Sequence, residues 1–222
     1  MLTALQRLTG DFESAIYEAG KLLAVRGAVI PVTLSKTTLN AELQNGTIVR
    51  GETNIDIPTH GRDSPIRRVW LAPQAFLNPR AKKAISEADA VIVGPGDLYT
   101  SLIPNLLIKG MSNALQKTRA KIIYMVNVMT KFGETNGFAA SDFLRVIEEY
   151  IAPGTIDYVV ANNRRPTPTR LRPYAGEKAQ FVVFDIAGSS KRPIPIVADL
   201  LRARGFLRHD SEKVAQLIRM IV

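Results

Sequence analysis

The sequence predicts an α/β fold with a mostly parallel sheet, because strand-like and helix-like segments alternate through its central part. Short runs rich in β-branched residues at 90–93, 121–126 and 157–161 are typical of buried strands. Segments at 102–117 and 141–150 separate them and space their apolar residues as helices do. Strands joined by helical crossovers lie parallel in one sheet, with helices on its faces.

Four further elements are expected before this alternation. Residues 11–23 and 79–88 space their apolar side chains as helices do, and residues 66–71 are expected to form a strand. Residues 28–34 are expected to form an edge strand or a bulged strand, because Pro31 has no N–H to donate to a neighbouring strand.

A β-hairpin is predicted around Asn45-Gly46, which lies between the runs 39–43 and 47–50. Asn-Gly between alternating runs indicates a hairpin because both residues tolerate the backbone of a tight turn. Residues 52–64 are expected to form a loop, so the hairpin and this loop define an insertion at 35–64.

The C-terminal part is expected to be less regular. Residues 162–176 are rich in proline and arginine, and we expect only short turns there. Short strands are predicted at 180–185 and 195–197, and a closing helix is predicted at 211–221.

The composition is that of a globular chain and excludes several kinds of chemistry. With 222 residues, 46% of them hydrophobic, residues 1–222 are expected to fold as one domain. The absence of cysteine excludes disulfides, thiolate metal sites and a cysteine nucleophile. Residues 1–10 lack the apolar core of a signal peptide, and no apolar run approaches the ~20 residues of a membrane span. We therefore expect a cytoplasmic protein without a membrane partner.

The positive charge is concentrated in one segment. Of 29 basic and 20 acidic residues, the segment 161–208 holds 10 basic and 3 acidic ones. Such a cluster favours an anionic partner: phosphate groups, nucleic acid or an acidic protein. The alternative is a solvated basic loop without a partner. Nucleic acid is not the expected partner, because the segment contains no groove-reading motif.

The loop after the first of the parallel strands has the pattern of an anion-binding site. Gly94-Pro95-Gly96 ends that strand, and Thr100 and Ser101 lead into the next helix. The free N–H groups of such a loop and the positive end of the helix dipole point to the same place. The alternative is a plain turn whose glycines only make it tight.

Polar residues also end the next two strands. Asn127 follows one of them and Asn162 follows the other. Ligands bind beyond the carboxyl ends of parallel strands, so we expect these residues and the glycine loop to share a crevice. Thr130 and Glu134 lie in the loop after Asn127, where Glu134 could accept hydrogen bonds from sugar hydroxyls. The alternative is that these side chains satisfy their own backbone.

Few other residues offer chemistry. Tyr174 could stack on a base or a sugar, and the Arg208 guanidinium could bind a diphosphate through two hydrogen bonds. His60 and His209 lie in loop-like segments without the spacing of metal ligands. The sequence therefore predicts no metal site, no catalytic triad and no Walker loop.

The string from Gly94 to Leu107 resembles the signature of the gluconeogenesis-factor (YvcK-like) family, which is related to the 2-phospho-L-lactate transferase (CofD-like) proteins. Residues 127–135 look like the second signature of that family. Residues 22–27, 49–52 and 208–210 are similar too, in the same order, so the resemblance covers essentially all of the chain.

The resemblance implies a Rossmann-like three-layer sandwich with a mostly parallel sheet and an added β-hairpin. It also implies a bacterial regulatory protein that is linked to carbon metabolism and cell shape and has no catalysis of its own. The implied ligand is a nucleotide sugar such as UDP-glucose or UDP-N-acetylglucosamine, and no cofactor is required. The crevice would be lined by Gly94, Pro95, Gly96, Asp97, Leu98, Tyr99, Thr100, Ser101, Asn105, Asn127, Thr130, Glu134 and Asn162, with Tyr174 and Arg208 at the uridine and diphosphate end.

The chain also departs from the family pattern. The family's N-terminal strand, with its Gly-Gly-Gly-Thr-Gly phosphate loop, and a following Asp-Asp-Gly-Gly segment have no counterpart here. Lys131-Phe132 stands where the family usually has Gln-Pro, and Phe143 stands where it often has His. Because the N-terminal strand of the family has no counterpart, we expect an open sheet edge, which favours a homo-oligomer.

Three alternative functions stay open at this point. The first is a transferase that joins a phospholactyl group to a deazaflavin, as the related proteins do. The second is a nucleic-acid-binding module that uses residues 161–208. The third is a truncated chain that folds only as an oligomer and binds nothing well.

Overall fold

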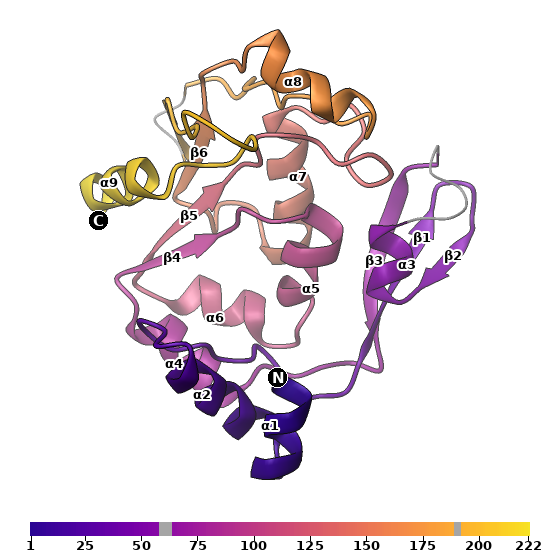
Figure 1. Ribbon diagram of the computed structural model, residues 1–222, viewed down its shortest axis with the longest axis vertical. Coiled ribbons are helices and arrows are strands. Elements are labelled where there is room, and N and C mark those ends of the chain that lie inside the picture. Colours follow the sequence, from indigo (N-terminus) through magenta and orange to yellow (C-terminus); the bar gives the residue numbers. More distant parts are fainter. Residues whose placement is uncertain (58–63, 189–191) are drawn as a thin grey trace.

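The computed structural model describes residues 1–57, 64–188 and 192–222. Within these ranges the chain forms a four-stranded sheet and a separate three-stranded sheet, with helices packed around the first (Figure 1). This arrangement confirms the predicted α/β, Rossmann-like fold.

The four-stranded sheet is parallel throughout. It consists of β4 (Ala90–Val93), β5 (Lys121–Met125), β6 (Tyr158–Asn162) and β7 (Ile194–Ala198). The strands lie side by side in the order of the sequence, β4-β5-β6-β7, and every neighbouring pair is parallel. Their carboxyl ends therefore meet at one edge of the sheet, where the sequence placed the crevice.

Helices cover both faces of this sheet. On one face, α5 (Ile103–Leu106), α6 (Met111–Lys117) and α7 (Ala140–Ile151) share a core with β5, in which Phe143 and Ile147 are fully buried. On the other face, α9 (Ser211–Ile221) packs Leu217 against Ile123 and Met125 of β5. The result is the three-layer arrangement that the sequence resemblance implied.

The predicted hairpin is confirmed. It is formed by β1 (Thr38–Leu43) and β2 (Ile48–Arg50), and β3 (Ile66–Ala72) pairs with the other side of β1. Gly46 makes the turn possible, because its φ of +83° belongs to the left-handed region that glycine adopts freely.

The expected loop at 52–64 is partly wrong. Residues Glu52–Asp56 form a short helix, α3, which buries Ile55 in the core of the sheets. Gly51 precedes this helix with a φ of +89°, and the Asn54 side chain donates to the Arg50 carbonyl at its start. The remaining loop residues 58–63, including His60, lie outside the described residues.

Helices near the N-terminus differ in part from the expectation. The structure confirms α2 (Phe12–Leu22) and α4 (Pro79–Glu87), and it adds α1 (Leu2–Thr9), which the sequence analysis missed. The predicted strand at 28–34 is absent from the described strands. The carbonyls of Pro31 and Val32 accept hydrogen bonds from Asn78 instead of from a neighbouring strand.

The single helix predicted at 102–117 is wrong. A π-helical turn, η1 (Leu98–Leu102), runs into α5, and the chain then leaves the helix before α6 begins. Gly110 has a φ of +102°, and the neighbouring Lys109 exchanges backbone hydrogen bonds with the segment around Ala75 and Leu77. These bonds to a distant segment replace the helical ones, so the helix is interrupted.

The C-terminal part corrects two more expectations. Residues 162–176 are not irregular throughout, because α8 (Pro168–Ala175) forms there with a proline in its first turn, where the missing N–H is no loss. Residues 180–185 form no strand, although Phe181 makes an isolated bridge to Met129. The strand predicted at 195–197 and the helix at 211–221 are confirmed as β7 and α9.

In the part of the chain that the structure describes, the two edge strands of the parallel sheet have no second neighbouring strand. β4 and β7 each pair on one side only, and Ile92 of β4 is 43% exposed.

No helix in the described ranges is long and apolar enough to cross a membrane.

Candidate functional site

A pocket of about 560 Å³ lies at the carboxyl ends of β4 and β5. Three segments that are far apart in the sequence line it. They are the glycine loop with the start of η1, the loop after β5, and a C-terminal segment before α9, and they contribute Pro95, Gly96, Asp97, Ser101, Asn127, Val128, Met129, Leu207, Arg208 and His209. Gly96 and Asn127 thus line one pocket, as predicted, but Gly94 and Asn162 do not line it.

Close packing accounts for the two glycines of the loop. A Cβ atom on Gly94 would lie 3.0 Å from the Met125 carbonyl oxygen, and Gly94 has a φ of +90°. A Cβ atom on Gly96 would lie 3.1 Å from the Leu102 side chain. The glycines therefore let the backbone approach β5 and the following helix, which larger residues would prevent.

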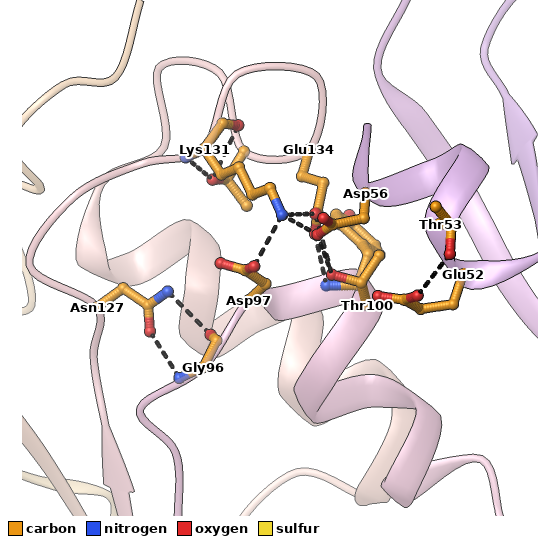
Figure 2. Close-up of polar contacts among 11 residues, drawn as sticks. Glu52, Thr53, Asp56, Gly96, Asp97, Thr100, Asn127, Lys131 and Glu134 are labelled. Atoms are coloured by element: carbon orange, nitrogen blue, oxygen red, sulfur yellow. Dashed lines mark hydrogen bonds and ion pairs between the residues drawn. The ribbon is translucent and has the colours of Figure 1, made fainter. Parts of the chain in front are cut away.

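Asn127 holds the glycine loop against the loop after β5. Its side-chain Nδ2 donates to the Gly96 carbonyl at 2.9 Å, and its Oδ1 accepts from the Gly96 N–H at 3.4 Å (Figure 2). Both polar atoms of this amide are used in shaping the pocket wall, so Asn127 positions Gly96.

The anion that binds the start of η1 is the protein's own carboxylate. Glu134 accepts from the Tyr99 N–H at 3.1 Å and from the Thr100 hydroxyl at 3.1 Å. One backbone N–H at the helix start, that of Tyr99, which was predicted to be free for a ligand, thus donates to Glu134. The predicted geometry is present, but a residue of this chain already uses it.

Lys131 lies among three carboxylates (Figure 2). Its Nζ is 2.7 Å from Asp97 Oδ2 and 3.1 Å from Glu134 Oε1, and it also contacts Asp56 of α3. These side chains come from three separate segments, so their charges join α3 to the two pocket loops. We call Asp56, Asp97, Glu134 and Lys131 the carboxylate cluster.

The cluster shifts the titration of its members. Burial by itself lowers the pKa of Lys131, but hydrogen bonds to Asp56 and Asp97 outweigh it, and the pKa is raised above its ordinary value. Burial raises the pKa of Glu134, against the opposing effect of the Lys131 charge. Lys131 is therefore a firmly held ammonium at neutral pH.

The three carboxylates also resemble a metal-binding group. One oxygen from each of Asp56, Asp97 and Glu134 lies within 4.8 Å of the others, which is close enough to coordinate one cation. In this chain the Lys131 ammonium lies among them. The cluster was not predicted, because Asp56 belongs to a segment that was expected to be a loop.

Four predicted site residues lie in the core or beside another cavity instead of lining the pocket. Leu98, Tyr99 and Thr100 are buried in the core around η1. Asn105 donates to the Ser101 carbonyl and lines a different, apolar cavity of about 390 Å³ beside β4. These four residues are not among those that line the pocket.

Thr130 and Asn162 each join two loops. The Thr130 hydroxyl accepts from the Gln180 N–H at 2.9 Å. The Asn162 amide accepts from the Leu200 N–H at 3.1 Å and donates to the Arg164 carbonyl. Both side chains are buried, so they stabilise the loops around the pocket without lining it.

Tyr174 and Arg208 occupy neighbouring but different positions. The Tyr174 hydroxyl accepts from the Leu207 N–H at 2.8 Å, and its ring packs beside Val128 and Leu201. Tyr174 therefore braces the segment that carries Arg208. Arg208 itself is exposed and lines the pocket, with its guanidinium 5.7 Å from the Phe206 ring.

His209 is a pocket residue that was not among the predicted site residues. It lines the pocket, and its Nε2 atom is buried without a hydrogen-bond partner among the described residues. Burial lowers the pKa of this imidazole, so the neutral form is favoured near pH 7. Only the tertiary fold reveals this environment, because the sequence shows a histidine in a loop.

The basic segment 161–208 is partly neutralised within the protein. Arg164 pairs with Asp199 at 2.9 Å, and Arg192 pairs with Asp157 at 2.8 Å. Some of the positive charge that suggested an anionic partner thus has structural partners, whereas Arg208 faces the pocket.

This fold is that of a CofD-type α/β protein. The family described as 2-phospho-L-lactate transferase CofD matches residues 1–201 of the chain. A solved structure from Bacillus halodurans, described as a member of the UPF0052 family, superposes with a TM-score of 0.89 at 35% identity. The match covers 98% of this chain and 70% of that one.

Sequence relatives define the branch of the family. The gluconeogenesis factor of Halalkalibacterium halodurans is 37% identical over 98% of this chain and 67% of that protein. The gluconeogenesis factor of Bacillus subtilis is 36% identical over 98% of this chain and 68% of that protein. A relative from Clostridium acetobutylicum is 38% identical, and the chain spans 49% of it, about half its length. The chain therefore belongs to the CofD family, in its gluconeogenesis-factor (YvcK-like) branch.

Proposed function

We propose that this chain is a regulatory protein of the gluconeogenesis-factor type that binds a nucleotide sugar and catalyses no reaction of its own. The ligand would be UDP-glucose or UDP-N-acetylglucosamine, bound without a cofactor in the pocket at the carboxyl ends of β4 and β5. The observation that carries this proposal is the meeting of Arg208 with the glycine loop and the Asn127 loop around one cavity.

The physical properties of the pocket suit such a ligand. Its volume of about 560 Å³ falls within the usual range for small-molecule sites. Arg208 is exposed there, and a guanidinium can bind a diphosphate with two parallel hydrogen bonds. The relatives named gluconeogenesis factors support a role in carbon metabolism. A link to cell shape and assembly into a homo-oligomer remain proposals that follow from the sequence resemblance.

Thermal unfolding tests the proposal directly. We expect UDP-N-acetylglucosamine and UDP-glucose at millimolar concentration to raise the melting temperature, since a ligand at 100 times its Kd stabilises by about 2.7 kcal/mol. Arg208→Ala should abolish the shift. Arg204→Ala removes an exposed arginine that does not line the pocket, so it should keep the shift. A cooperative melt that no UDP ligand moves would rule the proposal out.

A phospholactate transferase is the second candidate function. The matching family description and the convergence of Asp56, Asp97 and Glu134 favour it, because such a transferase is expected to need acidic metal ligands. Those carboxylates would become available to a metal only if Lys131 moved away. Incubation with a deazaflavin acceptor and an activated phospholactyl donor tests this candidate by mass spectrometry, and formation of the coupled product would replace the first proposal.

A further inference from the structure

The pocket contains a positive and a negative side chain that are not paired with each other. Arg208 lines one wall, and no ion pair of Arg208 is found among the described residues. Asp97 lines another wall and pairs with Lys131 at 2.7 Å. A ligand in this pocket thus meets a cation on one side and a carboxylate on the other.

The Asp97 carboxylate is anchored through one of its two oxygens. Its Oδ2 accepts from Lys131, and its backbone carbonyl accepts from the N–H groups of Ser101 and Leu102 at 2.9 and 3.0 Å. Its Oδ1 makes no hydrogen bond within the described part of the chain, and the side chain is 41% exposed. The free oxygen is an acceptor that is available to a donor from a ligand in the pocket.

Asp97 is the carboxylate of the cluster that a ligand can reach. Glu134 is 3% exposed, and its two oxygens already accept from Tyr99, Thr100 and Lys131. Asp56 does not line the pocket. Glu134 was the residue expected to bind sugar hydroxyls, but the geometry gives this possibility to Asp97.

The cluster also repels phosphate from this wall. Three carboxyl groups face one ammonium, so negative charge remains even when Glu134 is protonated. Like charges raise the energy of a phosphate near Asp97, whereas Arg208 attracts it. Neutral hydroxyl groups can donate to the free Asp97 oxygen without this cost.

We infer that Asp97 determines ligand specificity: it binds the hydroxyl groups of the sugar, while the diphosphate lies at Arg208. This inference rests on the proposed function and adds which part of the ligand lies at each wall of the pocket. Lys131 acts as a positioning residue, because it orients Asp97 without lining the pocket. The pocket therefore selects ligands that join a hydroxyl-rich group to a diphosphate.

Calorimetric titration of the full chain with UDP and with UDP-N-acetylglucosamine tests the inference. The wild type should bind the sugar nucleotide more tightly than UDP. Asp97→Ala should weaken binding of UDP-N-acetylglucosamine about tenfold, as expected for one lost hydrogen bond to a charged group. The same variant should leave UDP binding unchanged or improved, and Arg208→Ala should weaken both ligands.

Glu52→Gln is the matched control, because it removes an exposed carboxylate of α3 that belongs neither to the cluster nor to the pocket lining. It should keep the preference for the sugar nucleotide. Lys131→Met should reduce that preference while UDP still binds. Lys131→Arg, which keeps the positive charge, should retain the preference. Equal weakening of both ligands by Asp97→Ala, no change in either, or the same selective loss in Glu52→Gln would each overturn the inference. If the wild type bound neither ligand, the proposed function would fail as well.

Discussion

Glu134 accepts a hydrogen bond from the backbone N–H of Tyr99 at 3.1 Å, across 35 residues of sequence. The start of η1, where an external anion could have bound, is therefore satisfied from within the protein. This relationship divides the region into two parts. The inner part around Glu134 is structural, and the outer part around Gly96, Asp97 and Arg208 is open to a ligand.

Replacing Glu134 should destabilise the fold. Glu134→Ala leaves the buried Tyr99 N–H without an acceptor, and we expect a loss of about 2 kcal/mol in the free energy of unfolding. Urea denaturation measures this loss. Glu87→Ala removes an exposed glutamate whose ion pair with Lys83 is long, 3.8 Å, and it should change stability little. Equal losses in the two variants would contradict the structural role of Glu134.

The glycine loop should be sensitive to a single methyl group. Gly94→Ala adds a Cβ at 3.0 Å from the Met125 carbonyl oxygen and forces alanine to a φ of +90°, so we expect a loss of about 2–3 kcal/mol. Gly137→Ala meets no atom within 4 Å at a φ of +71°, and should cost only about 1 kcal/mol. Chemical denaturation compares the two. If Gly137→Ala were the more harmful, the close approach at Gly94 would not be the limiting feature.

Low pH should destabilise the protein through His209. Burial holds the pKa of its imidazole below the ordinary 6.5, so the unfolded chain binds this proton at a higher pH than the folded one does. The stabilisation by neutral His209 is complete above about pH 6.5 and is lost as the pH falls through the folded-state pKa. Urea denaturation at pH 8, 7, 6 and 5 should show a smaller acid loss in His209→Asn than in the wild type. Parallel curves for the two proteins would refute this prediction.

The Tyr174 hydroxyl should matter for the segment that carries Arg208. Tyr174→Phe removes the acceptor of the Leu207 N–H and should lower the free energy of unfolding by about 1 kcal/mol. Because Leu207 precedes Arg208, UDP binding should weaken too, although Tyr174 does not line the pocket. Calorimetry measures the binding, with Tyr158→Phe, on β6, as the control. Unchanged UDP affinity in Tyr174→Phe would show that this brace is dispensable.

Local sequence signals predicted the secondary structure best where local forces decide it. Asn45-Gly46 fixed the hairpin, and the β-branched run at 90–93 fixed the first parallel strand. The signals failed where distant segments compete for the backbone. Lys109 bonds to the chain around Ala75 and Leu77, and this contact, which no helical spacing reveals, interrupts the predicted helix at 102–117.

Contacts between distant segments also limited how much of the site could be predicted. The position of the pocket followed from the rule that parallel strands end at one edge, and Gly96, Asn127 and Arg208 do line it. The carboxylate cluster could not be predicted, because Asp56 and Lys131 are 75 residues apart and meet only through the packing of α3 on the loops. Ordinary polar residues in loops carry no signal for such a meeting.

The order of strands in the sheet has a consequence for how the binding pocket is made. Because β4, β5, β6 and β7 are neighbours in the same order in which they are synthesised, each new strand can add to an edge that already exists. Arg208 and His209 follow β7 in the chain, so the wall that they provide is translated after every strand of the sheet. A nascent chain that has not reached these residues has a groove without its cation, so tight ligand binding requires that translation has passed His209.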